Sequence, residues 1–288
     1  MSIIDILKSE PFVIEVLDIG AALNDRPPYQ SLVEAGRAHV IGFEPNVNEC
    51  RRLNETYGST HQFFPHFVGS GKSGTFFETN WNLTGSLFEP NAELNENFQN
   101  LAEAMTLVAR HPTDTIRLDD LTDLPEIDYI KIDIQGGELG VFENALRILP
   151  NVLAIQTEVE FVEMYKQQPM FADVDIFLRK NGFQFHTFTG FGTRAFKPMV
   201  IDGNLNKGLR QYLWSDAVYF RDWMALDLLP ETKLLKMAVI AHEMYRSYDL
   251  AYKILLALDK KATTGYAQRY LEQVNEAIRP PSTPRPVA

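Results

Sequence analysis

Cysteine is almost absent from this sequence of 288 residues, which contains only Cys50. A single cysteine excludes an internal disulfide and is typical of proteins from a reducing compartment. No stretch approaches the roughly 18 uncharged apolar residues that a membrane-spanning helix requires. The first ten residues lack the basic segment and the long apolar core of a signal peptide. We therefore expect a soluble, cytoplasmic protein without a membrane span.

Positive charge is also scarce, since 27 Lys and Arg face 38 Asp and Glu for a formal net charge of -11. This balance argues against nucleic acid or an anionic membrane as the main partner. The charge is uneven, because the last part of the chain carries a slight positive excess. The shift predicts a domain over residues 1–224, a helical appendage over 225–279 and a disordered, proline-rich tail over 280–288.

Several familiar motifs are missing. The three-glycine turn of NAD-binding domains does not occur, and the run Gly69–Ser73 lacks the spacing of a phosphate loop. No G-x-S-x-G elbow is present, and the six histidines show no metal-ligand spacing. These absences argue against an NAD-dependent oxidoreductase, a P-loop protein and a serine hydrolase.

The most informative stretch that is present is 127–138, an apolar run that breaks at Asp133, Gly136 and Gly137. An apolar run with one charge, Lys131, is typical of a strand buried on both faces of a parallel sheet. Ligands of open α/β sheets bind beyond the carboxyl ends of the strands. Asp133 is thus expected beside a ligand, and the alternative is that Asp133 and Lys131 neutralise each other inside the fold.

Strands and helices are predicted to alternate along the chain. Strands are predicted over 12–18, 38–43, 62–68, 113–118, 127–134, 152–161, 183–188 and 217–221, with a hairpin or edge strand at 75–77. Helices are predicted over 3–9, 29–35, 46–57, 91–109, 138–149 and 171–181, followed by a helical hairpin over 234–258 and a third helix over 267–278. The alternation indicates an α/β fold with a mostly parallel sheet, helices on both faces and an antiparallel pair at the last two strands.

Five blocks of this sequence, in their order and spacing, resemble the FkbM family of S-adenosylmethionine-dependent methyltransferases. They are 16–21 (Val-Leu-Asp-Ile-Gly-Ala), 42–46 (Gly-Phe-Glu-Pro-Asn), 118–121 (Leu-Asp-Asp-Leu), 127–138 and 217–221 (Ala-Val-Tyr-Phe-Arg). The resemblance covers residues 12–222 and implies a Rossmann-like class I methyltransferase fold with a seven-stranded sheet. It also implies O-methyl transfer, often to sugars or polyketides. The chain departs from the family pattern at Gln135, where glutamate is common, and at 23–28, where a second glycine is usual.

The resemblance assigns six residues to the S-adenosylmethionine site: Asp18, Gly20, Ala21, Glu44, Asn46 and Val68. An acidic residue after the second strand suits the two ribose hydroxyls of a nucleoside. The alternative for Glu44 is a carboxylate at the N-terminus of the following helix. Small residues such as Gly20 and Ala21 let the backbone approach a ligand.

Methyl transfer from a sulfonium is an in-line displacement, in which the protein aligns the acceptor oxygen and excludes water. A hydroxyl acceptor gains from a general base within hydrogen-bond reach. The candidates are Asp133, which is preferred, then Glu158 and Glu138. The alternative for Glu138 is a stabilising place in the first turn of its helix, and for Glu158 a buried ion pair. Mg²⁺ at Asp133 and its neighbours is conceivable but not favoured, and we assign no metal ligands.

We therefore expect an S-adenosylmethionine-dependent O-methyltransferase that acts on a hydroxyl of a sugar, a glycan or a glycosylated metabolite. The C-terminal helices look like part of one tetratricopeptide unit, and their apolar stripes suit a lid, a docking surface or a homo-oligomer. The alternative is a catalytically inactive module that keeps the methyltransferase fold and recruits partners through these helices.

Overall fold

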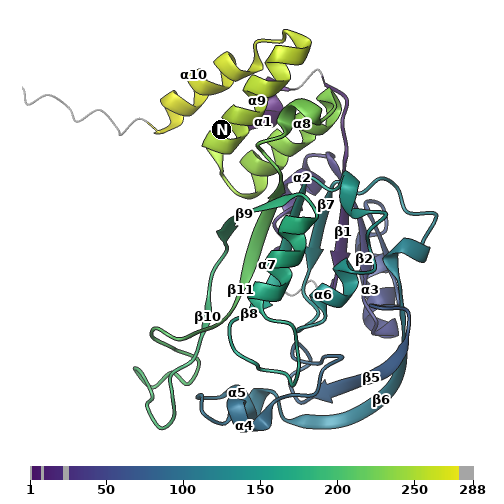
Figure 1. The fold of residues 1–288 in the computed structure, drawn as a ribbon, viewed down its shortest axis with the longest axis vertical. Helices are drawn as coiled ribbons and strands as arrows, with labels where there is room; N and C mark the ends of the chain where they lie inside the picture. Colours follow the sequence, from purple (N-terminus) through teal and green to yellow (C-terminus); the bar gives the residue numbers. More distant parts are fainter. Residues whose placement is uncertain (1, 8–9, 22–25, 279–288) are drawn as a thin grey trace, which may run out of the picture. The chain divides into compact units, whose positions relative to one another are not determined.

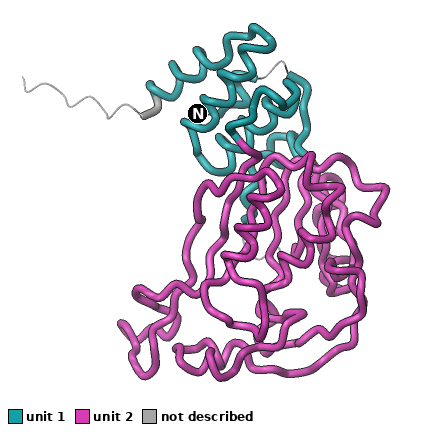
Figure 2. Tube along the Cα trace, in the orientation of Figure 1, with its two compact units in different colours: residues 1–14, 25–38, 223–288 teal, residues 15–24, 39–222 magenta. Residues whose placement is uncertain are grey.

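The structure is a computed structural model that describes residues 2–7, 10–21 and 26–278. The chain divides into two compact units, shown in Figure 2. Unit 1 contains residues 1–14, 25–38 and 223–288, and unit 2 contains residues 15–24 and 39–222. The predicted boundary near residue 224, which would separate an independently folding domain from the appendage, stays a prediction. The predicted tail at 280–288 lies outside the described residues.

Unit 2 is built on a mostly parallel sheet. Its strands in spatial order are β3 (His61–Phe64), β2 (Ala38–Phe43), β1 (Ile14–Ile19), β7 (Tyr129–Ile132), β8 (Ala154–Glu160), β11 (Tyr212–Arg221) and β10 (Gly192–Thr193), and β9 (Phe183–Phe188) also pairs with β11. Strands β3, β2, β1, β7 and β8 are mutually parallel, whereas β11 runs antiparallel to β8, β9 and β10. The predicted Rossmann-like methyltransferase fold is confirmed, and so is its antiparallel pair, but the sheet of the described residues has eight strands and not the predicted seven, because β10 adds a strand that was not predicted. The carboxyl ends of β1, β2, β7 and β8 lie at one end of the sheet.

The two faces of the central strands differ in polarity. One row of register partners is apolar and buried: Leu17, Ile130 and Ile155. The helices α6 (Glu138–Phe142) and α7 (Phe171–Lys180) lie over this core, as Figure 1 shows. The next row along the same strands is polar and consists of Asp18, Lys131 and Gln156. Because side chains alternate between the faces of a strand, the charged row lies opposite the hydrophobic core.

The helix predicted over 91–109 is wrong. These residues form two short helices, α4 (Ala92–Asn95) and α5 (Leu101–Ala104), followed by the strand β6 (Leu107–Ile116). A left-handed backbone at Asn100 (φ 56°) interrupts the helical path. Strand β6 pairs antiparallel with β5 (Ser73–Thr79), so a long-range pairing overrides the local helical pattern.

Two further elements are shorter than predicted. The strand predicted over 62–68 is divided into β3 and β4 (Phe67–Val68), since Pro65 between them has no N–H for a ladder. Strand β4 joins a second sheet of order β4-β6-β5. The helix predicted over 138–149 ends at Phe142, and the Asn144 side chain donates to the Gly140 carbonyl (2.8 Å) just beyond it. Such side-chain bonds offer the backbone an alternative to the helix.

Unit 1 is helical. It contains α1 (Ile3–Ile6), α2 (Gln30–Glu34), α8 (Glu231–Val239), a π-helical turn (Ile240–Met244), α9 (Tyr248–Ala262) and α10 (Tyr266–Ile278). The predicted C-terminal hairpin and third helix are confirmed. The Asp259 carboxylate fixes the turn between α9 and α10 by accepting from the backbone N–H groups of Tyr266 and Ala267, both at 2.9 Å. The likeness to a tetratricopeptide unit stays a prediction.

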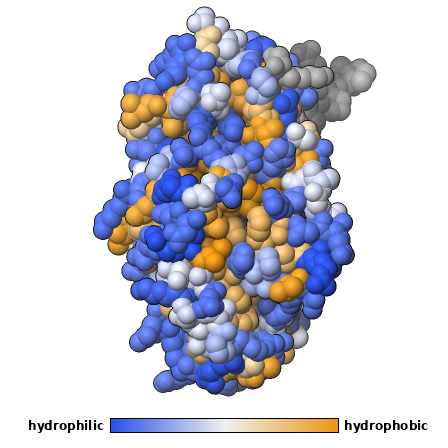
Figure 3. All heavy atoms as spheres, turned by 90° about the vertical axis from the view of Figure 1, so that its right-hand side faces the viewer, coloured by the Kyte–Doolittle hydropathy of each residue, from blue (hydrophilic) through white to orange (hydrophobic). Residues whose placement is uncertain are grey.

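No described helix has both the length and the apolar character needed to cross a bilayer. Figure 3 shows hydrophobic residues intermixed with hydrophilic ones over the face that it draws.

Candidate functional site

The end of β1 lies against the end of β7 because residue 20 is a glycine. Gly20 has φ +79°, and a Cβ atom built there would lie 2.0 Å from the carbonyl oxygen of Asp133. The Asp133 N–H donates to the Ile19 carbonyl (3.0 Å), and the N–H groups of Gly20 and Ala21 both donate to the Phe43 carbonyl (3.1 Å). These backbone contacts hold the ends of β1, β2 and β7 together, so the predicted site residues that follow these strands share one region.

Asp18 is fully buried and faces Lys131 across the β1–β7 pair. The Lys131 Nζ lies 3.4 Å from Asp18 Oδ1. Burial opposes the charge on Lys131, but Asp18, Asp133 and Asp216 outweigh it and raise the pKa of the ammonium above its usual value. The close ion pair of Lys131 is thus with Asp18, and the alternative of a simple Asp133–Lys131 pair is not what the structure shows.

Glu44 follows β2 and is 8% exposed. Its Oε1 accepts from the Asn46 N–H (2.8 Å), while Asn46, and not Glu44, caps α3 (Val47–Tyr57) by accepting from the N–H groups of Asn48 and Glu49. Burial raises the pKa of the Glu44 carboxyl, partly offset by the bond from Asn46. No second hydrogen bond to Glu44 is found within the described chain. One carboxylate oxygen is therefore available to a sugar hydroxyl, and the residues present fit a nucleoside cofactor.

The remaining predicted cofactor residues are placed by the backbone. Val68 is buried in the hydrophobic core that also contains Phe43 at the end of β2. Ala21 is buried beside Phe63 under α3. The part of the first loop at 22–25, which departs from the family pattern, lies outside the described residues.

Gln135 joins two of the three predicted catalytic carboxylates. Its Nε2 donates to Asp133 Oδ1 (2.8 Å) and to Glu158 Oε2 (2.6 Å), and its Oε1 accepts from the Tyr165 hydroxyl (2.8 Å). The backbone at Gln135 is left-handed (φ 61°), and its carbonyl accepts from Ser86 Oγ (2.6 Å). The structure thus brings Asp133 and Glu158 onto one amide, which occupies the position where the sequence departs from the family's glutamate.

Burial governs the protonation of the other carboxyls. Glu138 is 2% exposed and accepts from the Ile134 N–H (2.8 Å), and burial raises its pKa to about 8, with Asp133 adding to the increase. Burial also raises the pKa of Glu158, followed in effect by the charges of Asp133 and Glu160. The closest described partner of Glu158 is the Gln135 amide and not a cation. Desolvated carboxyls that lie close together cannot all be ionised at neutral pH.

Sequence reasoning missed three residues of this region. Glu160 and Asp216 lie on the same face as Glu158, since Asp216 pairs with Glu158 across β8 and β11. Asp216 accepts from Gln156 Nε2 (3.1 Å), and burial raises its pKa to about 6. The polar residues at every second position of β8 were a signal for this face. Nothing in the sequence pointed to Tyr165.

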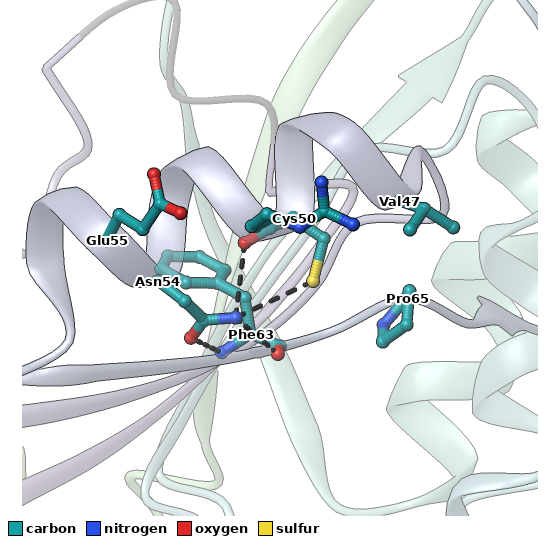
Figure 4. Close-up of a pocket in the computed structure, with 7 residues that line it drawn as sticks. Val47, Cys50, Asn54, Glu55, Phe63 and Pro65 are labelled. Carbon is teal, nitrogen blue, oxygen red and sulfur yellow. Dashed lines mark hydrogen bonds between the residues drawn. The ribbon is translucent and has the colours of Figure 1, made fainter.

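Two open depressions of unit 2 lie elsewhere. One of about 470 Å³ is lined by α3 and β3 residues including Val47, Cys50, Asn54 and Phe63, and Figure 4 shows Asn54 bound to the backbone of Phe63. A groove of about 830 Å³ lies over the β2–β3 edge and the loop at 120–125. Neither is lined by a predicted site residue, because the strand-end carboxyls are buried.

The described residues of this region do not form a preformed binding site for a divalent metal. Among the residues that the structure describes, no group of three or more His, Cys, Asp or Glu side chains is arranged to hold a metal ion. The Lys131 ammonium already supplies a positive charge beside Asp18. The expectation that Mg²⁺ is not favoured stays a prediction.

The chain is similar to known proteins in its sequence and, more weakly, in its structure. The model of the methyltransferase FkbM domain matches residues 18–185. A solved structure of a suggested tRNA (m1A22) methyltransferase from Streptococcus pneumoniae is 14% identical over 94% of this chain and 93% of its own, with a TM-score of 0.38. Magnesium protoporphyrin IX methyltransferase from Synechocystis PCC 6803, solved with bound SAM, is 11% identical over 76% of each chain, with a TM-score of 0.36.

No curated protein matches the sequence. The family match covers more than half of the chain and begins at Asp18, the buried acid at the end of β1. It extends through the strands whose ends hold Glu44, Asp133 and Glu158. The chain therefore belongs to the FkbM methyltransferase family and is an S-adenosylmethionine-dependent methyltransferase.

Proposed function

We propose that this enzyme methylates a hydroxyl group of a sugar or glycan, with Asp133 and Glu158 receiving the proton of that hydroxyl. The observation that supports this is the Gln135 amide, which holds both carboxylates at 2.8 and 2.6 Å. A base must lie within hydrogen-bond reach of the proton that it removes, and a pair fixed by one amide is positioned before the acceptor arrives.

When bound, S-adenosylmethionine would supply the electrophilic methyl group, whose bond to sulfur breaks on transfer, and would leave as S-adenosylhomocysteine. The protein orients the acceptor and excludes water, and in our proposal Asp133 accepts the hydroxyl proton as the new O–C bond forms. Glu158, whose pKa is raised, then shares that proton through the hydrogen-bonded cluster. Glu138 serves the backbone, since it accepts from the Ile134 N–H at the start of the turn.

For the cofactor we propose the six residues expected from the family: Asp18, Gly20, Ala21, Glu44, Asn46 and Val68. Glu44 would bind ribose hydroxyls, and Asn46 supports it through the N–H that Glu44 accepts. Asp18 acts through the Lys131 ion pair, which keeps a positive charge fixed at the strand ends.

Replacement of the proposed base is the direct test. Asp133→Asn should lower kcat about 100-fold or more, the usual range for a general base, while the affinity for S-adenosylmethionine changes little. Asp123→Asn, an exposed residue of the loop at 120–125, is the matched control. Unaltered turnover in Asp133→Asn would exclude this carboxylate as the base.

The acceptor is tested by incubating the enzyme with a panel of sugars and a radiolabelled methyl donor. Label in a sugar product supports the proposal, and label only in a non-sugar acceptor contradicts it. Calorimetry with S-adenosylmethionine tests the less favoured alternative of an inactive binding module, which predicts no binding. A homo-oligomer through the C-terminal helices stays a prediction that light scattering can check.

A further inference from the structure

Buried polar atoms without hydrogen-bond partners are rare in folded proteins, and each one calls for an explanation. Within the described residues, five such side-chain atoms occur: His61 Nε2, Asn95 Oδ1, Glu160 Oε1, Gln168 Nε2 and Arg194 Nε. Two of them, on Glu160 and Gln168, belong to the segment 160–168, and a third is on Asn95, whose Nδ2 donates to the Met164 carbonyl (3.0 Å). The segment begins where β8 ends, directly beyond Glu158.

Two of these atoms are oxygen acceptors, and the one on Glu160 is closer in sequence to the proposed base. It is 2% exposed and points to the same face of β8 as Glu158, two residues earlier. Burial raises the pKa of its carboxyl, with Glu138 and Asp133 adding to the increase. Its register partner on β11 is Trp214, which is half-buried. The unused Oε1 therefore belongs to the carboxyl cluster. An aromatic residue, Trp214, lies opposite Glu160 on the neighbouring strand.

Gln168 is the corresponding donor. It is 5% exposed, and its Oε1 accepts from the Tyr165 N–H (2.6 Å), which fixes the orientation of the amide and leaves Nε2 without a partner. A Cβ atom at Gly136 would lie 3.3 Å from Gln168 Cβ. The amide thus packs against the turn that carries Gln135, the residue holding Asp133 and Glu158.

Arg194 adds a cation over the ring of Trp214. Its guanidinium carbon lies 5.1 Å from the centre of the Trp214 ring, and its NH1 donates to the Thr193 carbonyl (2.8 Å). No carboxylate pairs with Arg194 in the described part of the chain. Trp214 belongs to β11, and its ring packs directly on β10, since a Cβ atom at Gly192 would lie 2.0 Å from it.

We propose that Glu160 and Gln168 form an acceptor subsite that holds a second hydroxyl of the sugar, with Trp214 beside its ring. A hydroxyl donates one hydrogen bond and accepts another, so one unused carboxyl oxygen and one unused amide N–H match its needs. This inference rests on the proposed function, because it requires a hydroxyl-bearing acceptor at Asp133 and Glu158. It narrows the acceptor class to a pyranose with a free hydroxyl close to the one that is methylated.

The competing explanation is ordered water that serves a purely structural purpose at both atoms. The two explanations differ in which property the side chains control. A subsite governs KM for the sugar, whereas structural water governs folding stability. An unused polar atom held for a ligand contributes nothing to the stability of the free protein, so its removal is neutral or stabilising.

The experiment compares the wild type with Glu160→Gln and Gln168→Glu, which replaces the unused Nε2 donor but keeps an oxygen for the Tyr165 N–H, and with Glu163→Gln as a matched control. Glu163 lies in the same segment but is exposed. The probes are the methyl pyranosides of glucose, galactose, mannose and rhamnose with radiolabelled S-adenosylmethionine. For the pyranoside that is methylated fastest, we expect KM to rise about tenfold or more in both variants. We expect kcat and the affinity for S-adenosylmethionine to stay within about threefold, and Tm to be unchanged or higher.

Deoxy analogues of that pyranoside provide a readout that does not depend on stability. The analogue that lacks the held hydroxyl should show the raised KM with the wild type and little further increase with either variant. Unchanged KM in both variants, with methylation retained, overturns the subsite and leaves the proposed function standing. The subsite is also overturned if each variant raises KM by the same factor for every deoxy analogue as for the parent pyranoside. If the wild type methylates no pyranoside, the sugar acceptor and the subsite both fall.

Discussion

At the residue scale, the approach of Gly20 to the Asp133 carbonyl is the contact that most constrains the cofactor end of the sheet. In Gly20→Ala the new Cβ would overlap this oxygen at 2.0 Å, so the strand ends must separate. We expect the free energy of unfolding to fall by at least about 3 kcal/mol and cofactor binding to be lost. Denaturant unfolding and calorimetry check this. Gly203→Ala, at φ +70° with no atom within 4 Å, should cost only about 1–2 kcal/mol for its backbone, and an equal loss in both would contradict the overlap.

Glu44 provides the second prediction at this scale. Glu44→Ala removes the acceptor proposed for the ribose hydroxyls, so the Kd for S-adenosylmethionine should rise about 10–100-fold, the size of one or two hydrogen bonds to a charged group. Titration calorimetry measures the change, with the exposed Glu55→Ala in α3, the helix that follows Glu44, as the control. An unchanged Kd would remove Glu44 from the cofactor site.

At the scale of elements, the turn between β7 and α6 links stability to pH. The pKa of Glu138 is raised to about 8, so its proton is bound in the folded state and lost in the unfolded state between roughly pH 4.5 and 8. The stability that this group contributes is therefore present at low pH and lost as pH rises through the folded value. Glu138→Gln keeps the bond from Ile134 without titrating. Its stability relative to the wild type should rise by up to about 1.4 kcal/mol per pH unit across that window. Denaturation midpoints from pH 5 to 9 measure it, and a flat difference, like that expected for the exposed Glu143→Gln, would contradict it.

The elements also show what the sequence can and cannot predict. Strands such as β1 and β7 are buried on both faces, so their apolar runs are visible in any window of the chain. The start of strand β6 was predicted as helix, because its pairing with β5 is a long-range contact that leaves no local pattern, whereas its end lies within the strand predicted over 113–118. In the site, strand-end acids at Asp133 and Glu158 followed from topology. The role of Gln135 did not, because it depends on a left-handed backbone and on a hydroxyl from Tyr165, thirty positions away in the chain.

At the scale of the whole molecule, unit 1 depends on both ends of the chain. Within it, Glu243 Oε1 accepts from the Ile3 N–H (3.0 Å), and α1 packs against α10. A chain that ends at residue 222 should therefore unfold less cooperatively and be cut early within its first 38 residues. Thermal unfolding and limited proteolysis test this, with a chain that ends at residue 278 as the control. An unchanged Tm after truncation at 222 would instead support residues 1–224 as an independent domain.

The discontinuity of unit 1 has a consequence for biosynthesis. The helices α1 and α2 emerge from the ribosome before the π-helical turn and α10, which pack against them. An interrupted translation product therefore presents bare apolar turns at its start, which chaperones and proteases recognise. Until the later helices of unit 1 have been synthesised, the apolar faces of α1 and α2 are therefore left for chaperones to cover.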